Sequence, residues 1–158
     1  MVRTNNDSVF YYLSLYKLTQ KLEADILNEW YKKNADAEKE LFYAKILGDK
    51  IKIITALKNN NKYPEIEELY PSYLKEFKET DITSEHKLYL LMGDVYNSTE
   101  RYKSAEKMYL KALHFFELKE NHSTVNLIYN GLKKNKLHSG DLAGHAYYTN
   151  KLFELSKS

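Results

Sequence analysis

The chain has 158 residues, of which 43% are hydrophobic and 29% are charged, the balance of one folded domain rather than of a disordered chain. Its 24 basic and 22 acidic residues give a net charge of +2, too little for binding to nucleic acid or to an anionic membrane. It has no cysteine, which excludes disulfides, thiol catalysis and zinc sites built on cysteine. With only two prolines and five glycines, the composition favours long helices over a β-sandwich or barrel.

Residues 1–25 lack the apolar core and the cleavage site of a signal peptide, and no segment is apolar enough to span a membrane. We therefore expect a cytoplasmic protein whose partners include neither membranes nor nucleic acids.

Apolar residues recur every three or four positions in the first part of the chain and predict a helix over about residues 8–33. The apolar stripe of this helix consists of Leu15, Leu18, Leu22, Ile26 and Trp30. Tyr12 and Tyr16 widen the apolar surface, so we expect the helix to be buried on two sides. It would then cap a helical array or form a homodimer.

The next helical pattern runs from Ala37 to Leu57 and passes through Gly48, where a close crossing of two helices is expected. Residues 59–61 are three asparagines and predict a loop. Pro64 suits the first turn of the following helix, and Pro71 predicts a kink or a restart of that helix.

The second half of the chain predicts four more helices and no strand. They cover about Glu85–Asn97, Glu100–Lys119, His122–Lys134 and Gly140–Lys157. The sequence thus predicts a single all-α domain of about seven helices. Residues 1–82 would supply helices that cap the array, and residues 83–158 would form two helix pairs.

The segment from His86 to Glu117 resembles a tetratricopeptide repeat, a unit of two paired helices. The matching residues are Tyr89, Met92, Gly93 and Tyr96 in the first helix and Tyr102, Ala105, Tyr109 and Ala112 in the second. The resemblance implies that the helices cross at Gly93 and Ala105, where small side chains let two backbones approach. It also implies that Tyr96, Tyr102 and Tyr109 fill the space between one helix pair and the next. Glu117 stands where the family usually has a proline.

A second copy of the pattern lies 38 residues later. Gly131, Ala143 and Tyr147 repeat the spacing of the glycine, the alanine and the second-helix tyrosine, and Leu127 takes the first bulky position. Lys134 replaces the first-helix tyrosine.

The C-terminal half is also similar to the helical sensor domains of Gram-positive peptide-pheromone receptors of the Rap, Rgg and PlcR types. The run from Leu27 to Lys32, LNEWYK, resembles a run near the start of Rap-type proteins. The chain is much shorter than those proteins and has no helix-turn-helix and no counterpart of the phosphatase's catalytic glutamine. The resemblance therefore implies a bacterial regulatory protein that binds a peptide, without phosphatase activity or DNA binding.

In tetratricopeptide arrays the first helix of each pair lines a concave groove, which implies where a ligand would bind. Asn97 and Asn135 take the same groove position in the two copies, and an asparagine side chain can pair with the backbone of an extended peptide. The other residues expected to line the groove are Leu90, Asp94, Ile128 and Leu132. Alternatively, the two asparagines merely occupy helix ends, which asparagine favours.

Two other groups of residues suggest contacts with ligands or partners. Tyr11, Tyr12, Tyr63 and Tyr70 have no place in the repeat pattern and would suit a partner surface. His138, Asp141 and His145 are spaced three and four apart, so on one helix they would share a face that could bind a divalent metal. Asp141 also suits a helix cap.

The sequence therefore predicts a regulatory adaptor that binds a protein segment or a peptide on its concave face, with no enzymatic activity, metal or cofactor. One alternative is a structural module that self-associates through the N-terminal helices. The other is a metal-dependent enzyme built on His138, Asp141 and His145.

Overall fold

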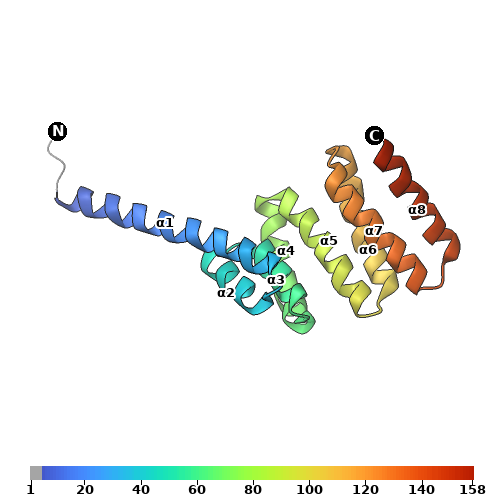
Figure 1. Ribbon diagram of the computed structural model, residues 1–158, viewed down its shortest axis with the longest axis horizontal. Coiled ribbons are helices and arrows are strands. Elements are labelled where there is room, and N and C mark those ends of the chain that lie inside the picture. The colour runs from blue at the N-terminus through green and yellow to red at the C-terminus, as the bar shows by residue number, and fades with distance from the viewer. Residues whose placement is uncertain (1–4) are drawn as a thin grey trace. The chain divides into compact units, whose positions relative to one another are not determined.

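The computed structural model describes the backbone of residues 5–158 and the side chains of Ser8 and of residues 11–158. Over this range the chain forms eight α-helices and no strand, which confirms the predicted all-α helical-repeat fold (Figure 1). The helices are α1 (Asn5–Lys33), α2 (Ala37–Leu47), α3 (Lys50–Asn59), α4 (Tyr63–Thr80), α5 (Ile82–Ser98), α6 (Tyr102–Leu118), α7 (His122–His138) and α8 (Leu142–Lys157).

The chain divides into two compact units, Met1–Ile66 and Glu67–Ser158, and the boundary lies inside α4. The first unit contains α1, α2, α3 and the first turn of α4. The second contains the rest of α4 and the pairs α5–α6 and α7–α8. The sequence predicted a boundary between residues 82 and 83, at the start of α5, whereas most of α4 belongs to the second unit.

In the first unit, α1 packs against α2 through the face that carries Ala24 and Asn28. Ala24 is 2% exposed and Asn28 is 1% exposed. Nδ2 of Asn28 donates a hydrogen bond of 2.7 Å to the backbone carbonyl of Glu40. The apolar stripe of α1 points elsewhere, and its five residues are all exposed. The expectation that α1 is buried on two sides is therefore wrong for the described chain.

Gly48 ends α2 instead of continuing it, so the single helix expected from Ala37 to Leu57 is two helices. Its φ of 68° lies in the left-handed region that glycine adopts without strain, and its N–H donates to carbonyls of the last turn. Asp49 then caps α3 by accepting from the N–H of Lys52 over 3.0 Å. The expected close crossing is absent, because a methyl group at Gly48 would meet no described atom within 4 Å.

Ionic contacts join α3 to α1 beside this packed face. Nζ of Lys52 lies 2.6 Å from Oε1 of Glu29 and 3.2 Å from Oδ1 of Asp25. The hydrogen bond from Lys52 lowers the pKa of Glu29. These contacts link α3 to the C-terminal half of α1.

The helix α4 runs unbroken from Tyr63 to Thr80 although Pro71 lies inside it, so it does not restart there. Tyr70 has a packing role in the second unit, because its hydroxyl lies 3.8 Å from Sδ of Met108 in α6. Burial raises the pKa of Tyr70 to about 12. Tyr11 and Tyr12 on α1 are instead exposed, at 55% and 67%.

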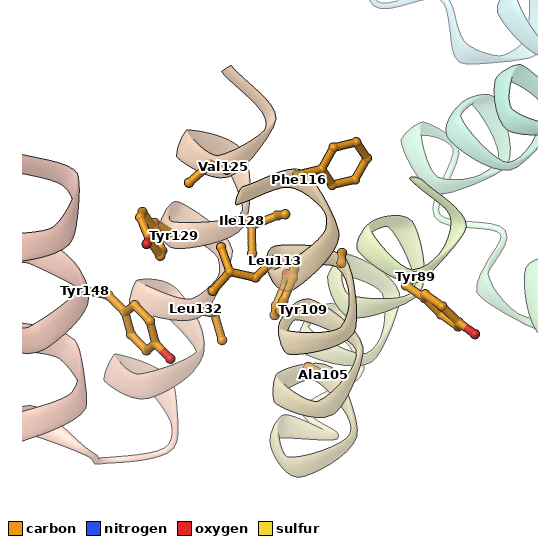
Figure 2. Close-up of a cluster of buried hydrophobic side chains, with 11 residues drawn as sticks. Tyr89, Ala105, Tyr109, Leu113, Phe116, Val125, Ile128, Tyr129, Leu132 and Tyr148 are labelled. Carbon is orange, nitrogen blue, oxygen red and sulfur yellow. The ribbon is translucent and has the colours of Figure 1, made fainter. Parts of the chain in front are cut away.

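The helices α5 to α8 form two pairs joined by tight turns. Asp81 caps α5 by accepting from the N–H of Ser84, and Asn121 caps α7 by accepting from the N–H of Thr124. The core of this unit takes side chains from all four helices (Figure 2). Its members are Tyr89, Ala105, Tyr109, Ala112, Leu113, Phe116, Val125, Ile128, Tyr129, Leu132 and Tyr148.

Candidate functional site

Tyr109 of α6 is the centre of the second unit and is 1% exposed (Figure 2). Its ring lies against two glycines. A Cβ added at Gly93 of α5 would come within 2.6 Å of its Cδ1, and one at Gly131 of α7 within 2.6 Å of its Cζ. The Tyr109 hydroxyl donates to Oδ1 of Asp94 over 2.8 Å, and burial together with this carboxylate raises the pKa of Tyr109. Gly93 thus makes room for an aromatic ring, rather than for the approach of two backbones that the resemblance implied.

The structure brings Asn97 and Asn135 together. Nδ2 of Asn135 donates to Oδ1 of Asn97 over 3.2 Å and to the backbone carbonyl of Tyr102 over 2.9 Å. Asn135 is 1% exposed, whereas Asn97 is half-buried. The Asn135 amide therefore joins α7 to α5 and α6, in a place that a bound peptide does not reach. A contact within the chain replaces the peptide ladder expected from these two residues.

The two helix pairs repeat at an interval of 40 residues rather than 38. Ile82 begins α5 and His122 begins α7, while Tyr102 begins α6 and Leu142 begins α8. The buried residues follow the same interval: Leu88, Tyr89, Met92 and Val95 of α5 correspond to Ile128, Tyr129, Leu132 and Asn135 of α7. The interval of 38 aligned the two glycines. They are not equivalent, because both contact the same Tyr109 ring.

This interval changes the position of three predicted residues. Ile128 and Leu132 have no exposed surface and belong to the core, whereas the sequence placed them on a groove wall. The aromatic residue that α8 adds to the core is Tyr148, which is 8% exposed, and not Tyr147, which is 55% exposed. Leu90, on α5, remains partly exposed.

The open side of α7 consists of residues that the sequence did not single out. At the interval of 40, the α5 residues Lys87, Leu90, Asp94 and Asn97 correspond to the α7 residues Leu127, Asn130, Lys134 and Leu137, and all eight are exposed or half-buried. We call these eight residues the α5–α7 face. The two helices contact each other, and the Asn135–Asn97 hydrogen bond joins their C-terminal ends.

A local signal in the sequence would have revealed the correct interval. The caps Asp81 and Asn121 stand 40 residues apart, and each accepts a hydrogen bond from the N–H three residues later. Caps mark helix starts directly, whereas glycines serve several kinds of packing.

Asp141 is the N-terminal cap of α8, as its position suggested. Its Oδ1 accepts from the N–H of Gly144 over 2.8 Å, and its Oδ2 lies 3.2 Å from Nζ of Lys136. The backbone hydrogen bond and the lysine both lower the pKa of Asp141. Lys136 also lies 2.7 Å from Oε1 of Glu106. The Asp141 carboxylate is therefore part of an ionic contact that links α6, α7 and the start of α8.

The two histidines near Asp141 have separate surroundings. Nδ1 of His145 lies 3.1 Å from the backbone carbonyl of Lys133, and the ring of His138 stands edge-on to the ring of Tyr102 at 6.3 Å. His138 also lines an open pocket of about 520 Å³ at the start of α6, with Arg101 among its other walls. Within residues that the structure describes, no group of three or more His, Cys, Asp or Glu is arranged to hold a metal ion.

No helix in the described part of the chain combines the length and the apolar character needed to cross a membrane. Compared with models of protein families, with curated proteins and with solved structures, the chain gives no match. The resemblance to tetratricopeptide repeats and to pheromone receptors therefore stays a prediction that rests on the residues that carry it.

Proposed function

We propose that the chain binds an extended segment of another protein, or a peptide, along the α5–α7 face, and that it acts as a regulatory adaptor. The observation that supports this proposal is the repetition of open positions at one interval on two helices in contact. Asp94 of α5 corresponds to Lys134 of α7, so the face carries both signs of charge.

The chemistry of the face suits a segment that mixes apolar and charged side chains. Leu127 is 61% exposed and Leu137 is 47% exposed, and together they offer apolar contact along α7. Lys134 lies between them and would pair with a carboxylate of the ligand. Since most of Tyr109 and Asn135 is covered, these buried residues hold the two helices in place instead of touching the ligand.

A selection from a displayed library of random peptides tests the proposal, because no ligand has to be known in advance. Peptides retained by the wild-type chain are synthesised with a fluorescent label, and their affinities are measured by anisotropy. We expect Lys134→Glu to weaken binding by about tenfold or more, because it reverses a charge inside the face.

The matched control is Lys107→Glu, which makes the same charge change at an exposed position of α6. It should bind the peptides as the wild type does, with unchanged helical circular dichroism in both variants. Failure to select any peptide, or equal binding by the wild type and Lys134→Glu, would argue against this face.

A further inference from the structure

The first unit carries a large apolar surface that no described element covers. The α1 stripe consists of Leu15, Leu18, Leu22, Ile26 and Trp30, which are 48%, 54%, 58%, 69% and 54% exposed. All side chains from residue 11 to residue 23 are exposed, and the N-terminal half of α1 extends beyond α2 and α3 (Figure 1). Contiguous apolar surface of this kind on a helix marks an interaction site.

The helix α1 needs support beyond its own hydrogen bonds. Most helical stability in proteins comes from the packing of an apolar face rather than from the propensity of the helix itself. In the C-terminal half, α2 supplies that packing at Ala24 and Asn28. In the N-terminal half no described element supplies it, although the apolar stripe continues there.

We propose that the α1 stripe pairs with the α1 stripe of a second copy of the chain, with the two helices antiparallel. A twofold axis between Gln20 and Lys21 would set Leu15 of one copy opposite Ile26 of the other, and would bring Leu18 within one residue of the position opposite Leu22. The unsupported half of each α1 then packs on the half that α2 already holds. This pairing uses only the first unit and does not depend on peptide binding by the α5–α7 face.

The exposed area is sufficient for such a dimer. From the exposed fractions, the stripe with Tyr12 and Tyr16 on its border presents roughly 900 Å² of side chain per copy. Two copies would therefore bury roughly 1,200 to 1,800 Å², which is the size of a standard stable interface.

The charges along α1 favour a second copy in the antiparallel direction. Residues 11–21 contain two charged residues, Lys17 and Lys21, and both are basic. Residues 22–31 contain three, Glu23, Asp25 and Glu29, and all are acidic. Lys52 lies beside Asp25 and Glu29, Lys32 lies 3.9 Å from Glu29, and Lys32 and Lys33 end the helix, so the acidic excess is confined to residues 22–31. Antiparallel pairing brings Lys17 and Lys21 of one helix close to the acidic segment 22–31 of the other, whereas parallel pairing sets lysine beside lysine and carboxylate beside carboxylate.

Sedimentation of the full chain over a range of concentrations tests the dimer. We expect a monomer–dimer equilibrium that Leu18→Gln/Leu22→Gln weakens by more than about tenfold, because the variant removes four leucines from the interface. The chain's single tryptophan, Trp30, should shift its emission to the blue as the concentration rises. The matched control is Leu110→Gln/Leu118→Gln, which replaces two exposed leucines of α6 and should leave the dimer unchanged.

Cross-linking tests the direction, and the lack of cysteine in the chain makes it specific. Leu15→Cys mixed with Ile26→Cys should form a disulfide between the two variants on oxidation, whereas Leu15→Cys alone should not cross-link to itself. A wild-type chain that stays monomeric at all concentrations would overturn the proposal. Equal weakening by the α6 control, or preferential cross-linking of Leu15→Cys to itself, would also overturn it.

Discussion

The α1 stripe and the core around Tyr109 both consist of large apolar side chains at helical spacing, yet one is exposed and the other is buried. In the second unit, α5 and α7 cover Tyr109 from two sides, and their glycines lie against its ring. In the first unit, α2 packs on the face of Ala24 and Asn28, so Leu18 and the rest of the stripe remain exposed.

The comparison shows that a helical period identifies side chains that share a face but does not identify what covers them. The burial of Tyr109 depends on particular partners. Gly93 and Gly131 leave room for its ring, and Asp94 accepts a hydrogen bond from its hydroxyl. Leu18 has no equivalent set of partners within the described chain. A second copy of α1 is the partner that we propose for it.

The largest expected effect distinguishes these two regions directly. Tyr109→Ala should lower the free energy of unfolding by about 3 to 5 kcal/mol, because it leaves a cavity at the centre of the core. Leu18→Ala should change it by less than about 0.5 kcal/mol at a concentration at which the chain is monomeric. Urea unfolding followed by circular dichroism measures both values, and similar losses would contradict the contrast.

A milder variant separates the ring of Tyr109 from its hydroxyl. Tyr109→Phe keeps the ring between the two glycines and removes only the hydrogen bond to Asp94. It should cost about 0.5 to 1.5 kcal/mol. A loss as large as that of Tyr109→Ala would mean that the hydroxyl, rather than the packing of the ring, dominates the core.

The sequence predicted the fold because the patterns that specify it are local. Apolar spacing and caps placed the helices of the second unit close to their observed bounds, and the pattern around Gly93 identified α5 and α6 as a pair. The error at Gly48 arose because a glycine in an apolar helical pattern suits either a helix interior or a helix end. The left-handed φ of Gly48 ends the helix there, and the spacing of apolar residues does not predict φ.

The candidate site was harder to predict, because it depends on the register between two helix pairs. An error of two residues turns a helix by more than half a turn, so Ile128 and Leu132 exchanged places with the open residues of α7. The sequence placed Asn97 and Asn135 at the same groove position, whereas the second amide is buried and donates to the first. Exposure of Lys134 and Leu137 followed only from the packed structure.

A third prediction tests whether Asn135 is a structural residue. Asn135→Ala removes the donor to Oδ1 of Asn97 and to the carbonyl of Tyr102, so it should cost about 1 to 3 kcal/mol. Asn130→Ala makes the same change on the more open side of α7 and should cost less than about 0.5 kcal/mol. If urea unfolding showed a loss for Asn135→Ala as small as the one expected for Asn130→Ala, the hydrogen bonds of Asn135 would contribute no net stability.

The smallest expected effect concerns the charge of Asp141, which adds to the stability that packing gives to the C-terminal end of the second unit. The pKa of Asp141 is lower in the folded chain than in an unfolded one, because the N–H of Gly144 and Lys136 stabilise its charged form. Its contribution to stability is therefore present above the ordinary pKa of aspartate, about 3.9, and is lost as the pH falls through the lowered value.

Asp141→Asn keeps a side chain that can cap α8 and removes this charge, so it isolates the electrostatic part of the contact. We expect the variant to unfold at a lower temperature than the wild type at neutral pH, and the difference to close as the pH falls through the lowered pKa of Asp141. Added salt should narrow the difference at neutral pH, because it screens the exposed contact with Lys136. If the difference in unfolding temperature persisted unchanged in acid, Asp141 would act through its shape and hydrogen bonds and not through its charge. Its contribution would then be of the same kind as that of the packed core around Tyr109.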